Sequence, residues 1–517
     1  MRGAALAGAA LFILIACSPA EDGPPITPEG AAAIVAGVTE GLAFYLPEAN
    51  GIRYELAGPV TAVPQQDHYL LTIPALTITT PATGSVLRLG AANAKVVPTA
   101  EGTYRFDGTM GDRITLDGAD QPNQLSITLG AQSLTGIWSP AYRTALDYQG
   151  RFENIVATVA GRDGPVQTSI GLVTATSASK PSAAAAPTPA PGTAQSQAPA
   201  SLLDLNGTFA AERLLTTGPE GERIAIAGLS GDLSLSGTDV ATMMDASARL
   251  QETQPDPVTG QVPPERMDQM LAALGDMLGA YGHAGSFTMS LKGLEVVDGA
   301  ESVRLDSLTT RFAAGATDGS GRLGMTLGFG GLALTPAQEP AALIPGSMAI
   351  DIALEQLPMA QLKPLLTEFM RLSADPSQMD AAGQVLAMQM VAALSQAGSR
   401  LALADLKVET PGSGLTGSGA VTVDQAAALG ATADLTFTLR NLDAAIQALG
   451  PKPGEPADPE AAGTLMALGM VQGFGQPGTD GEGRPVLTYR IQATPQGQLL
   501  LNGQDLAPML QAMQQMR

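Results

Sequence analysis

Apolar and polar residues alternate near the middle of the chain and then change to a helical spacing. Over residues 347–355 one side of an extended chain carries the apolar positions Met348, Ile350, Ile352 and Leu354. From Pro358 onward, apolar residues recur at intervals of three and four residues, as in a helix that packs on a core: Met359, Leu362, Leu366, Phe369 and Met370. Residues 343–372 therefore predict a strand that runs directly into an amphipathic helix.

Other segments repeat this strand-to-helix plan. Residues 233–244 (LSLSGTDVATMM) match residues 499–510 (LLLNGQDLAPML), with a helix expected near the Asp of each. Residues 352–357 (IALEQL) match residues 437–442 (FTLRNL), and each runs into a helical pattern. Recurrent units of this kind predict an α+β, β-rich fold: one or more large curved antiparallel sheets with helices packed on one face.

The first half predicts one helix followed by many short strands. Thr27 can cap a helix with Pro28 in its first turn, which would run to about Tyr45 with Ile34, Val38 and Leu42 on one face. Residues 51–159 then alternate short apolar runs with Gly, Pro, Asn and Asp turns. The connections are too short for crossovers, so the strands are expected to be antiparallel.

A change in composition divides the mature chain. Residues 177–201 are rich in Pro and Ala, with almost nothing to bury, and predict a linker between an N-terminal β-rich unit, 27–176, and a C-terminal β-rich unit with helices, 202–517. The alternative is that both halves share one sheet and the segment loops out. Residues 1–17 are expected to be a signal peptide and residues 18–26 a short tether.

The N-terminus predicts export and lipidation. Arg2 precedes an apolar run of secretory-signal length that ends in Leu14-Ile15-Ala16-Cys17, and Cys17 is the only cysteine of the chain. That tetrapeptide resembles the bacterial lipobox, which implies that Cys17 carries the lipid that anchors a periplasmic protein to the inner or outer membrane. The alternative is ordinary cleavage after Ala20. No later run has the length of ~18 uncharged apolar residues that a spanning helix needs.

Charge and candidate chemistry argue against several classes of function. The net charge of −22 disfavours a nucleic-acid partner. The chain has only two histidines, His68 and His283, so a histidine-rich metal site is excluded, and His68 beside Asp67 would point to the opposite face of a strand. The G-x-G-x-x-G match at residues 412–417 leads into a strand rather than a helix. We therefore expect no catalytic residue, no cofactor and no metal.

Methionine is the one residue type whose distribution suggests a function. Of 20 methionines, 18 lie at or beyond Met243. Flexible thioethers suit a groove that accepts varied apolar ligands, and the candidate lining residues are Met267, Met270, Met359 and Met370. The same residues also suit a loosely packed core beneath helices.

The signal, the strand entries IPALTITT and LADLKVET, the unit AIDIALEQLPMAQL and the ending YRIQATPQGQLLLNG resemble a known group. The chain resembles an uncharacterised alphaproteobacterial family of periplasmic proteins of unknown function and, more distantly, the AsmA-like and YdgA-like envelope proteins. The resemblance implies an exported, non-catalytic envelope lipoprotein, and its AsmA-like side implies a lipid or other apolar ligand in envelope maintenance. The alternatives are a structural or interaction lipoprotein with a packed core and, least favoured, a hydrolase.

Overall fold

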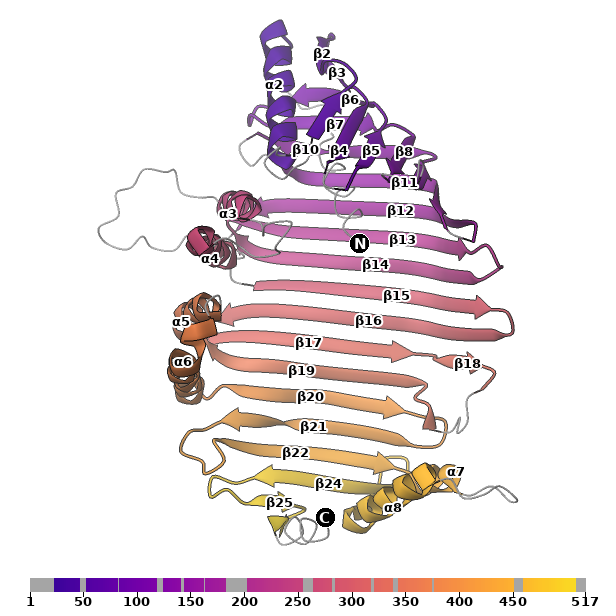
Figure 1. Ribbon diagram of the computed structural model, residues 1–517, viewed down its shortest axis with the longest axis vertical. Coiled ribbons are helices and arrows are strands. Elements are labelled where there is room, and N and C mark those ends of the chain that lie inside the picture. Colours follow the sequence, from indigo (N-terminus) through magenta and orange to yellow (C-terminus); the bar gives the residue numbers. More distant parts are fainter. Residues whose placement is uncertain are drawn as a thin grey trace. The chain divides into compact units, whose positions relative to one another are not determined.

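The computed structural model describes most of the chain as an antiparallel β-protein (Figure 1). The described residues are 23–46, 53–81, 83–118, 124–140, 144–161, 163–182, 202–253, 264–280, 284–317, 320–337, 343–373, 376–450 and 459–507. Strands hold more of the described residues than helices do and form a large antiparallel sheet, so the predicted β-rich class is confirmed. The packing of the helices on one face of that sheet stays a prediction.

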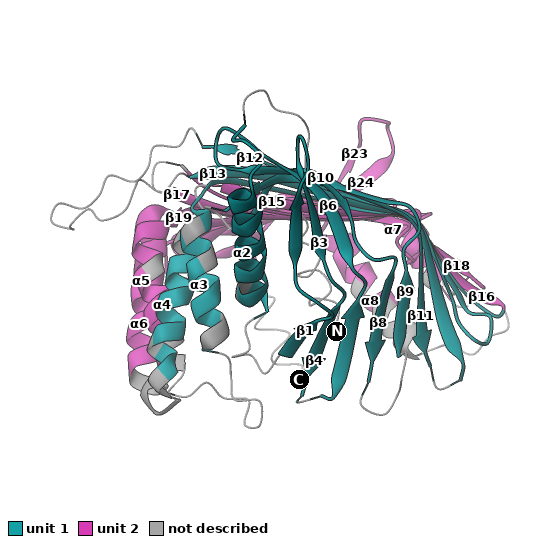
Figure 2. Cartoon of the chain, turned by 90° about the horizontal axis from the view of Figure 1, so that it is seen from above, with its two compact units in different colours: residues 1–282, 295–299 teal, residues 283–294, 300–517 magenta. Residues whose placement is uncertain are grey.

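The chain forms two compact units, coloured separately in Figure 2. The first comprises residues 1–282 and 295–299, and the second residues 283–294 and 300–517, so β15 (Ala284–Asp298) contributes to both. These boundaries differ from those expected at residues 177–201. Residues 177–181 belong to a strand, and the two strands that follow residue 201 lie in the first unit.

Helix α2 (Pro28–Tyr45) starts where the sequence predicts. Thr27 is its N-cap, and the Thr27 hydroxyl accepts a hydrogen bond from the Gly30 amide at 3.1 Å. The Thr27 amide donates to the Tyr69 hydroxyl at 2.9 Å, which joins the start of the helix to the sheet. The predicted apolar face is buried through Ile34, Val38 and Leu42.

The short strands of the first unit form two arms that meet on β11 (Thr144–Ala160). One arm pairs in the order β1–β4–β5–β8–β9, and the other in the order β2–β3–β6–β7–β10; β9 and β10 both pair with β11. Their bounds are β1 (Arg53–Leu56), β2 (Thr61–Pro64), β3 (Tyr69–Ile73), β4 (Leu76–Thr80), β5 (Ser85–Leu89), β6 (Ala92–Pro98), β7 (Tyr104–Thr109), β8 (Arg113–Asp117), β9 (Leu125–Thr128) and β10 (Gln132–Ser139).

The two arms and α2 share a packed apolar core. Its most deeply buried side chains include Leu42, Leu71, Val96, Phe106 and Leu134. Apolar positions in β3 and β4 alternate between buried and less buried, as the sequence predicts. Burial on this scale supplies the main stabilising free energy of the unit.

The first unit continues as long strands. After β11 come β12 (Pro165–Pro181), β13 (Leu203–Thr217) and β14 (Arg223–Thr238), each paired antiparallel with the one before. Helix α3 (Val240–Glu252) packs against α4 (Pro264–Ala280). Asp239 caps α3, as the repeated motif predicts, by accepting from the Thr242 amide at 3.0 Å.

The second unit is organised on seven strands paired in the order β16–β17–β19–β20–β21–β22–β24. Their bounds are β16 (Glu301–Thr317), β17 (Ser320–Gly330), β19 (Ser347–Pro358), β20 (Arg400–Glu409), β21 (Gly414–Val423), β22 (Ala431–Arg440) and β24 (Pro485–Ala493). Four short strands extend its edges: β18 (Ala333–Thr335), β23 (Gln476–Thr479), β25 (Leu499–Leu501) and β26 (Gln504–Asp505).

Four helices connect the strands of the second unit. They are α5 (Met359–Ser373), α6 (Pro376–Ala397), α7 (Leu442–Leu449) and α8 (Pro459–Phe474). β19 runs directly into α5, as the pattern of residues 343–372 predicts. Within the described part of the chain, none of the helices is both long and apolar enough to cross a membrane.

Candidate functional site

One face of the second unit's sheet is apolar across all seven main strands. Strand pairing aligns its side chains into four rows that run from β16 to β24, because cross-strand partners point to the same side. The rows are Leu308–Phe329–Met348–Val408–Leu415–Leu439–Leu487, Thr310–Leu327–Ile350–Leu406–Gly417–Phe437–Tyr489, Phe312–Met325–Ile352–Leu403–Gly419–Leu435–Ile491 and Ala314–Leu323–Leu354–Leu401–Val421–Ala433–Ala493. We refer to these four rows as the apolar face.

A bulge in β20 keeps the apolar face continuous. Leu401 and Leu403 are separated from Leu406 and Val408 by an odd number of residues, which on a regular strand would place the two pairs on opposite sides. The register shifts between Leu403 and Leu406, so both pairs lie opposite same-side residues of β21. The extra residue therefore returns the apolar side chains to one face.

The apolar face is not sealed from solvent. Phe312 is 51% exposed, Leu323 46%, Leu401 45% and Leu354 43%. Most other members are half-buried, and Tyr489 is buried. Large apolar side chains in this number are normally covered in a folded protein, so the face has the character of a binding surface.

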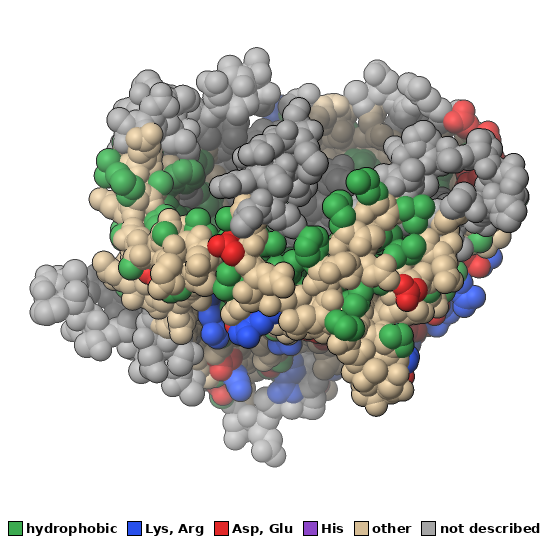
Figure 3. Space-filling model, turned by 90° about the horizontal axis from the view of Figure 1, so that it is seen from below, with side chains coloured by type: hydrophobic (Ala, Val, Ile, Leu, Met, Phe, Trp, Pro, Cys, Tyr) green, Lys and Arg blue, Asp and Glu red, His purple; other side chains and the backbone are tan. Residues whose placement is uncertain are grey.

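The opposite face of the same strands is charged. Glu355 of β19 lies between Arg322 of β17 and Arg400 of β20, with Glu355 Oε1 3.3 Å from Arg322 Nε and Glu355 Oε2 2.7 Å from Arg400 Nη2. Arg490 pairs with Asp434 at 2.5 Å. Figure 3 shows blue Lys and Arg side chains gathered in the lower part of the view and green hydrophobic side chains mainly above them.

These ion pairs lower the pKa values of their carboxyl groups. Hydrogen bonds from Arg400 and Arg322, with the positive charges of both guanidinium groups, hold the pKa of Glu355 below its ordinary value. Arg490 does the same for the pKa of Asp434. The two faces of the sheet thus differ in chemistry: the charged face carries ion pairs, and the apolar face carries hydrophobic side chains.

The methionines predicted to line a ligand site lie on two helices in different units. Met267 and Met270 are half-buried on α4, and Met359 begins α5 with 41% of its surface exposed. Met370 lies on α5, but its side chain is outside the described residues. The structure does not bring the four together within one unit, and their role as lining residues stays a prediction.

The sequence missed most of the apolar face. It identified the alternating residues of β19 but could not assign their partners, because one row runs through successive strand pairs from Leu308 to Leu487, which are 179 positions apart. Two methionines, Met325 and Met348, belong to the rows. The available signal was the alternation within each strand.

The histidine prediction needs one correction. His68 lies in the turn between β2 and β3 rather than on a strand, and its Nδ1 is 2.6 Å from Asp67 Oδ1. The expectation that these neighbours point apart is therefore wrong, because the alternation of a strand does not apply in a turn. His68 lowers the pKa of Asp67 through this hydrogen bond, and Asp67 is exposed.

The other residues considered in the sequence analysis do not form a site among the residues that the structure describes. His283 and Cys17 lie outside the described residues. Among the residues that the structure describes, no group of three or more His, Cys, Asp or Glu side chains could hold a metal ion. Residues 412–417 form a connection between β20 and β21 and the start of β21, as expected for a hairpin.

Comparison with known proteins gives one match. A family model described as "Bacterial protein of unknown function (DUF945)" matches residues 153–509. No curated protein and no solved structure matches the chain. The match spans the long strands of the first unit and all seven strands that carry the apolar face.

Proposed function

This chain belongs to the DUF945 family of bacterial proteins of unknown function, and we propose that it is a non-catalytic envelope protein that binds the acyl chains of a lipid on its apolar face. The observation that supports this proposal most is the continuity of the four rows. They cross seven strands without a single charged side chain.

The dimensions of the apolar face suit an acyl chain. Six spacings of ~4.8 Å between seven strands give a length of roughly 29 Å. The ~30 Å hydrocarbon core of a bilayer is made of two leaflets, so a single acyl chain spans about half of it and fits within the length of the face. An acyl chain laid across the strands would exchange water for apolar contact along its whole length.

The chemistry of the face favours a lipid over a peptide. The backbone groups of the interior strands pair with a strand on each side, so an added peptide would find no free sheet edge there. The side chains of the rows also offer few hydrogen-bonding groups: the Tyr489 hydroxyl already donates to the Val471 carbonyl at 2.8 Å, which leaves Thr310. A ligand held by shape and apolar contact alone matches this surface.

The competing function is a structural lipoprotein that binds no ligand. It would fit a protein whose apolar residues are all packed inside. The core around α2 has that character, but the apolar face does not, because its side chains remain half-buried or exposed. The exposed area therefore favours the lipid-binding function.

Lipid binding is tested by displacement of a fluorescent fatty acid from the full-length protein. Phe312→Asp together with Leu401→Asp places two charges on the apolar face at half-exposed positions, where the fold tolerates them. We expect binding to weaken about tenfold or more, since each charge must be desolvated against the chain. Ser418→Asp, at an exposed position of β21 on the charged face, is the control and should leave binding unchanged. Equal effects of both variants, or no binding by the original protein, would refute the proposal.

The location of the protein forms a separate part of the proposal. The lipobox at residues 14–17, together with the resemblance to periplasmic alphaproteobacterial and AsmA-like proteins, supports export and anchoring through Cys17. Metabolic labelling with a palmitate analogue should mark the original protein and not Cys17→Ala. Equal labelling of the two proteins, or no labelling of either, would contradict the anchor.

A further inference from the structure

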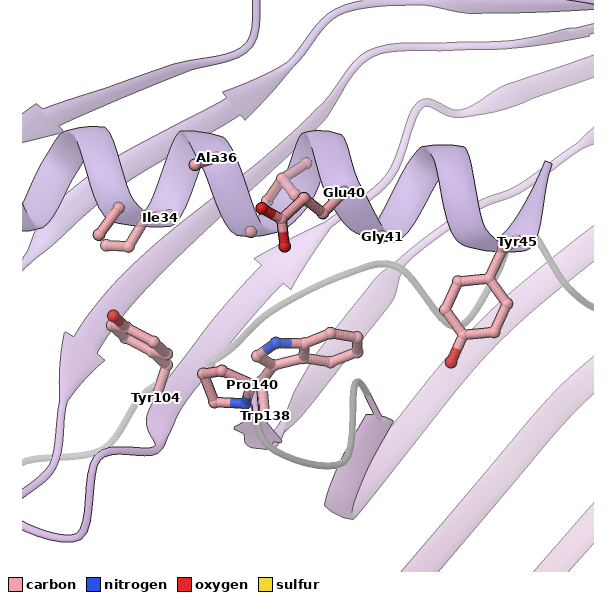
Figure 4. A pocket seen from close by; sticks show the side chains of 11 residues that line it. Ile34, Ala36, Glu40, Gly41, Tyr45, Tyr104, Trp138 and Pro140 are labelled. Atoms are coloured by element: carbon pink, nitrogen blue, oxygen red, sulfur yellow. The ribbon is translucent and has the colours of Figure 1, made fainter. Parts of the chain in front are cut away.

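A cavity lies in the first unit, against α2, and its lining includes no residue of the apolar face (Figure 4). It has a volume of about 350 Å³ and is lined by residues of α2 together with Tyr104, Trp138 and Pro140. Small-molecule sites typically have volumes of ~300–1,000 Å³, so this one has room for a compact ligand.

The α2 side of this cavity is open because its residues are small. Ala33, Gly37 and Gly41 recur at four-residue spacing and lie on one face of the helix. A Cβ atom added at Gly37 or at Gly41 would meet no heavy atom within 4 Å. The space above these glycines is therefore free, and the adjacent Ile34, Val38 and Leu42 hold the helix on the core.

The other walls are aromatic. Tyr104 from β7 and Trp138 from β10 lie across from the helix, and Tyr45 closes one end near the last turn of α2 (Figure 4). Tyr45 is fixed by a hydrogen bond with Thr144. Trp138 is half-buried and is the only tryptophan in the chain. Three aromatic rings around one small cavity present electron-rich faces to a ligand.

One charged group completes the lining. Glu40 of α2 is exposed and contributes to the lining of the cavity, on the helix that lies across from Trp138 (Figure 4). No Lys or Arg is among the lining residues, and within the described residues no cation forms an ion pair with Glu40. The cavity therefore combines a carboxylate with aromatic faces and lacks a compensating positive charge.

We propose that this cavity binds an organic cation of the quaternary ammonium class, held between the Glu40 carboxylate and the rings of Trp138, Tyr104 and Tyr45. A methylated ammonium is weakly hydrated and attracted to aromatic faces, and it has no strong hydrogen-bond donor to satisfy. The net charge of −22 adds a long-range attraction for cations. An anionic ligand would be repelled by Glu40.

The single tryptophan makes the site directly observable. The full-length protein is titrated with choline while Trp138 fluorescence is recorded, and a saturable change is expected. Dimethylbutanol, the uncharged carbon analogue of choline, should bind about tenfold more weakly, because it keeps the shape and loses the cation–π and charge contributions. Equal binding of the two compounds, or no saturable change with choline, would overturn the proposal.

Three variants test separately the charge of Glu40 and the shape of the cavity. Glu40→Gln should weaken choline binding about tenfold and leave dimethylbutanol binding unchanged. Glu29→Gln removes the same charge from the first turn of α2, outside the lining, and should leave both unchanged. Gly37→Leu fills the open space and should abolish choline binding. The melting temperature of the protein should stay the same. If Glu40→Gln and Glu29→Gln behave alike, the assignment of Glu40 is wrong. These results do not depend on lipid binding at the apolar face.

Discussion

A single glycine makes room for an ion pair on the charged face of the second unit. Gly414 lies in β21, and its lack of a side chain lets Glu409 of β20 and Arg440 of β22 form an ion pair above it. A Cβ atom at Gly414 would lie 2.9 Å from Glu409 Oε2 and 3.0 Å from Arg440 Nη2. Glycine is needed here for close approach rather than for an unusual backbone conformation.

Gly414→Ala is therefore expected to destabilise the second unit. The new methyl group displaces the ion pair, and we expect the free energy of unfolding to fall by about 1 kcal/mol in denaturant titration. Gly478→Ala is the matched control, because its Cβ would meet only Val486 Cγ2 at an ordinary 3.7 Å. If the two variants lose the same stability, the close contact at Gly414 has no energetic role.

Glu355 makes the stability of the second unit depend on pH. Its pKa is lowered below the ordinary 4.5 by Arg400 and Arg322, so its carboxylate stabilises the folded state at neutral pH. That contribution is lost as the pH falls from 4.5 through the lowered pKa. Glu355→Gln should cost about 1 kcal/mol at neutral pH and almost nothing in strong acid. Melting curves against pH test this, with Glu55→Gln as an exposed control; a pH-independent difference would contradict it.

At the scale of elements, local sequence signals were sufficient to predict where helices begin, but they did not predict which strands pair. Thr27 and Pro28 predicted the start of α2, and Asp239 predicted the start of α3, because capping depends only on neighbouring residues. The arms that meet on β11 could not be predicted, since short strands with similar patterns fit many pairings. The cavity at Trp138 was missed for the same reason: its walls come from α2, β7 and β10.

The cap of α2 gives a test at this scale. Thr27→Ala removes the hydroxyl that accepts from the Gly30 amide and should lower the free energy of unfolding by about 1 kcal/mol. Thr39→Ala on the same helix is the control. The Thr39 hydroxyl donates to the Val35 carbonyl at an exposed position, so alanine there should be neutral or slightly stabilising. Equal losses from both variants would show that the cap contributes nothing specific.

At the scale of the whole molecule, apolar residues are distributed unequally. The arms of the first unit enclose a packed core, whereas most apolar side chains of the four rows in the second unit stay half-buried or exposed on one face of the strands. The sequence predicted alternating strands but not that the apolar side would remain half-exposed, because exposure depends on what covers a sheet. The bulge in β20 is equally hidden in the sequence, where residues 401–408 look like two strands out of phase.

The proposed function depends most on the apolar face being the place where an acyl chain binds. The most direct measurement is photo-crosslinking of the full-length protein with a fatty acid that carries a diazirine near its end, followed by mass spectrometry of the labelled peptides. We expect labels on residues of the four rows, above all at the exposed Phe312, Leu323 and Leu401, and competition by unlabelled fatty acid. Labelling confined to the charged face or to other parts of the chain, or the absence of competed labelling, would contradict the account.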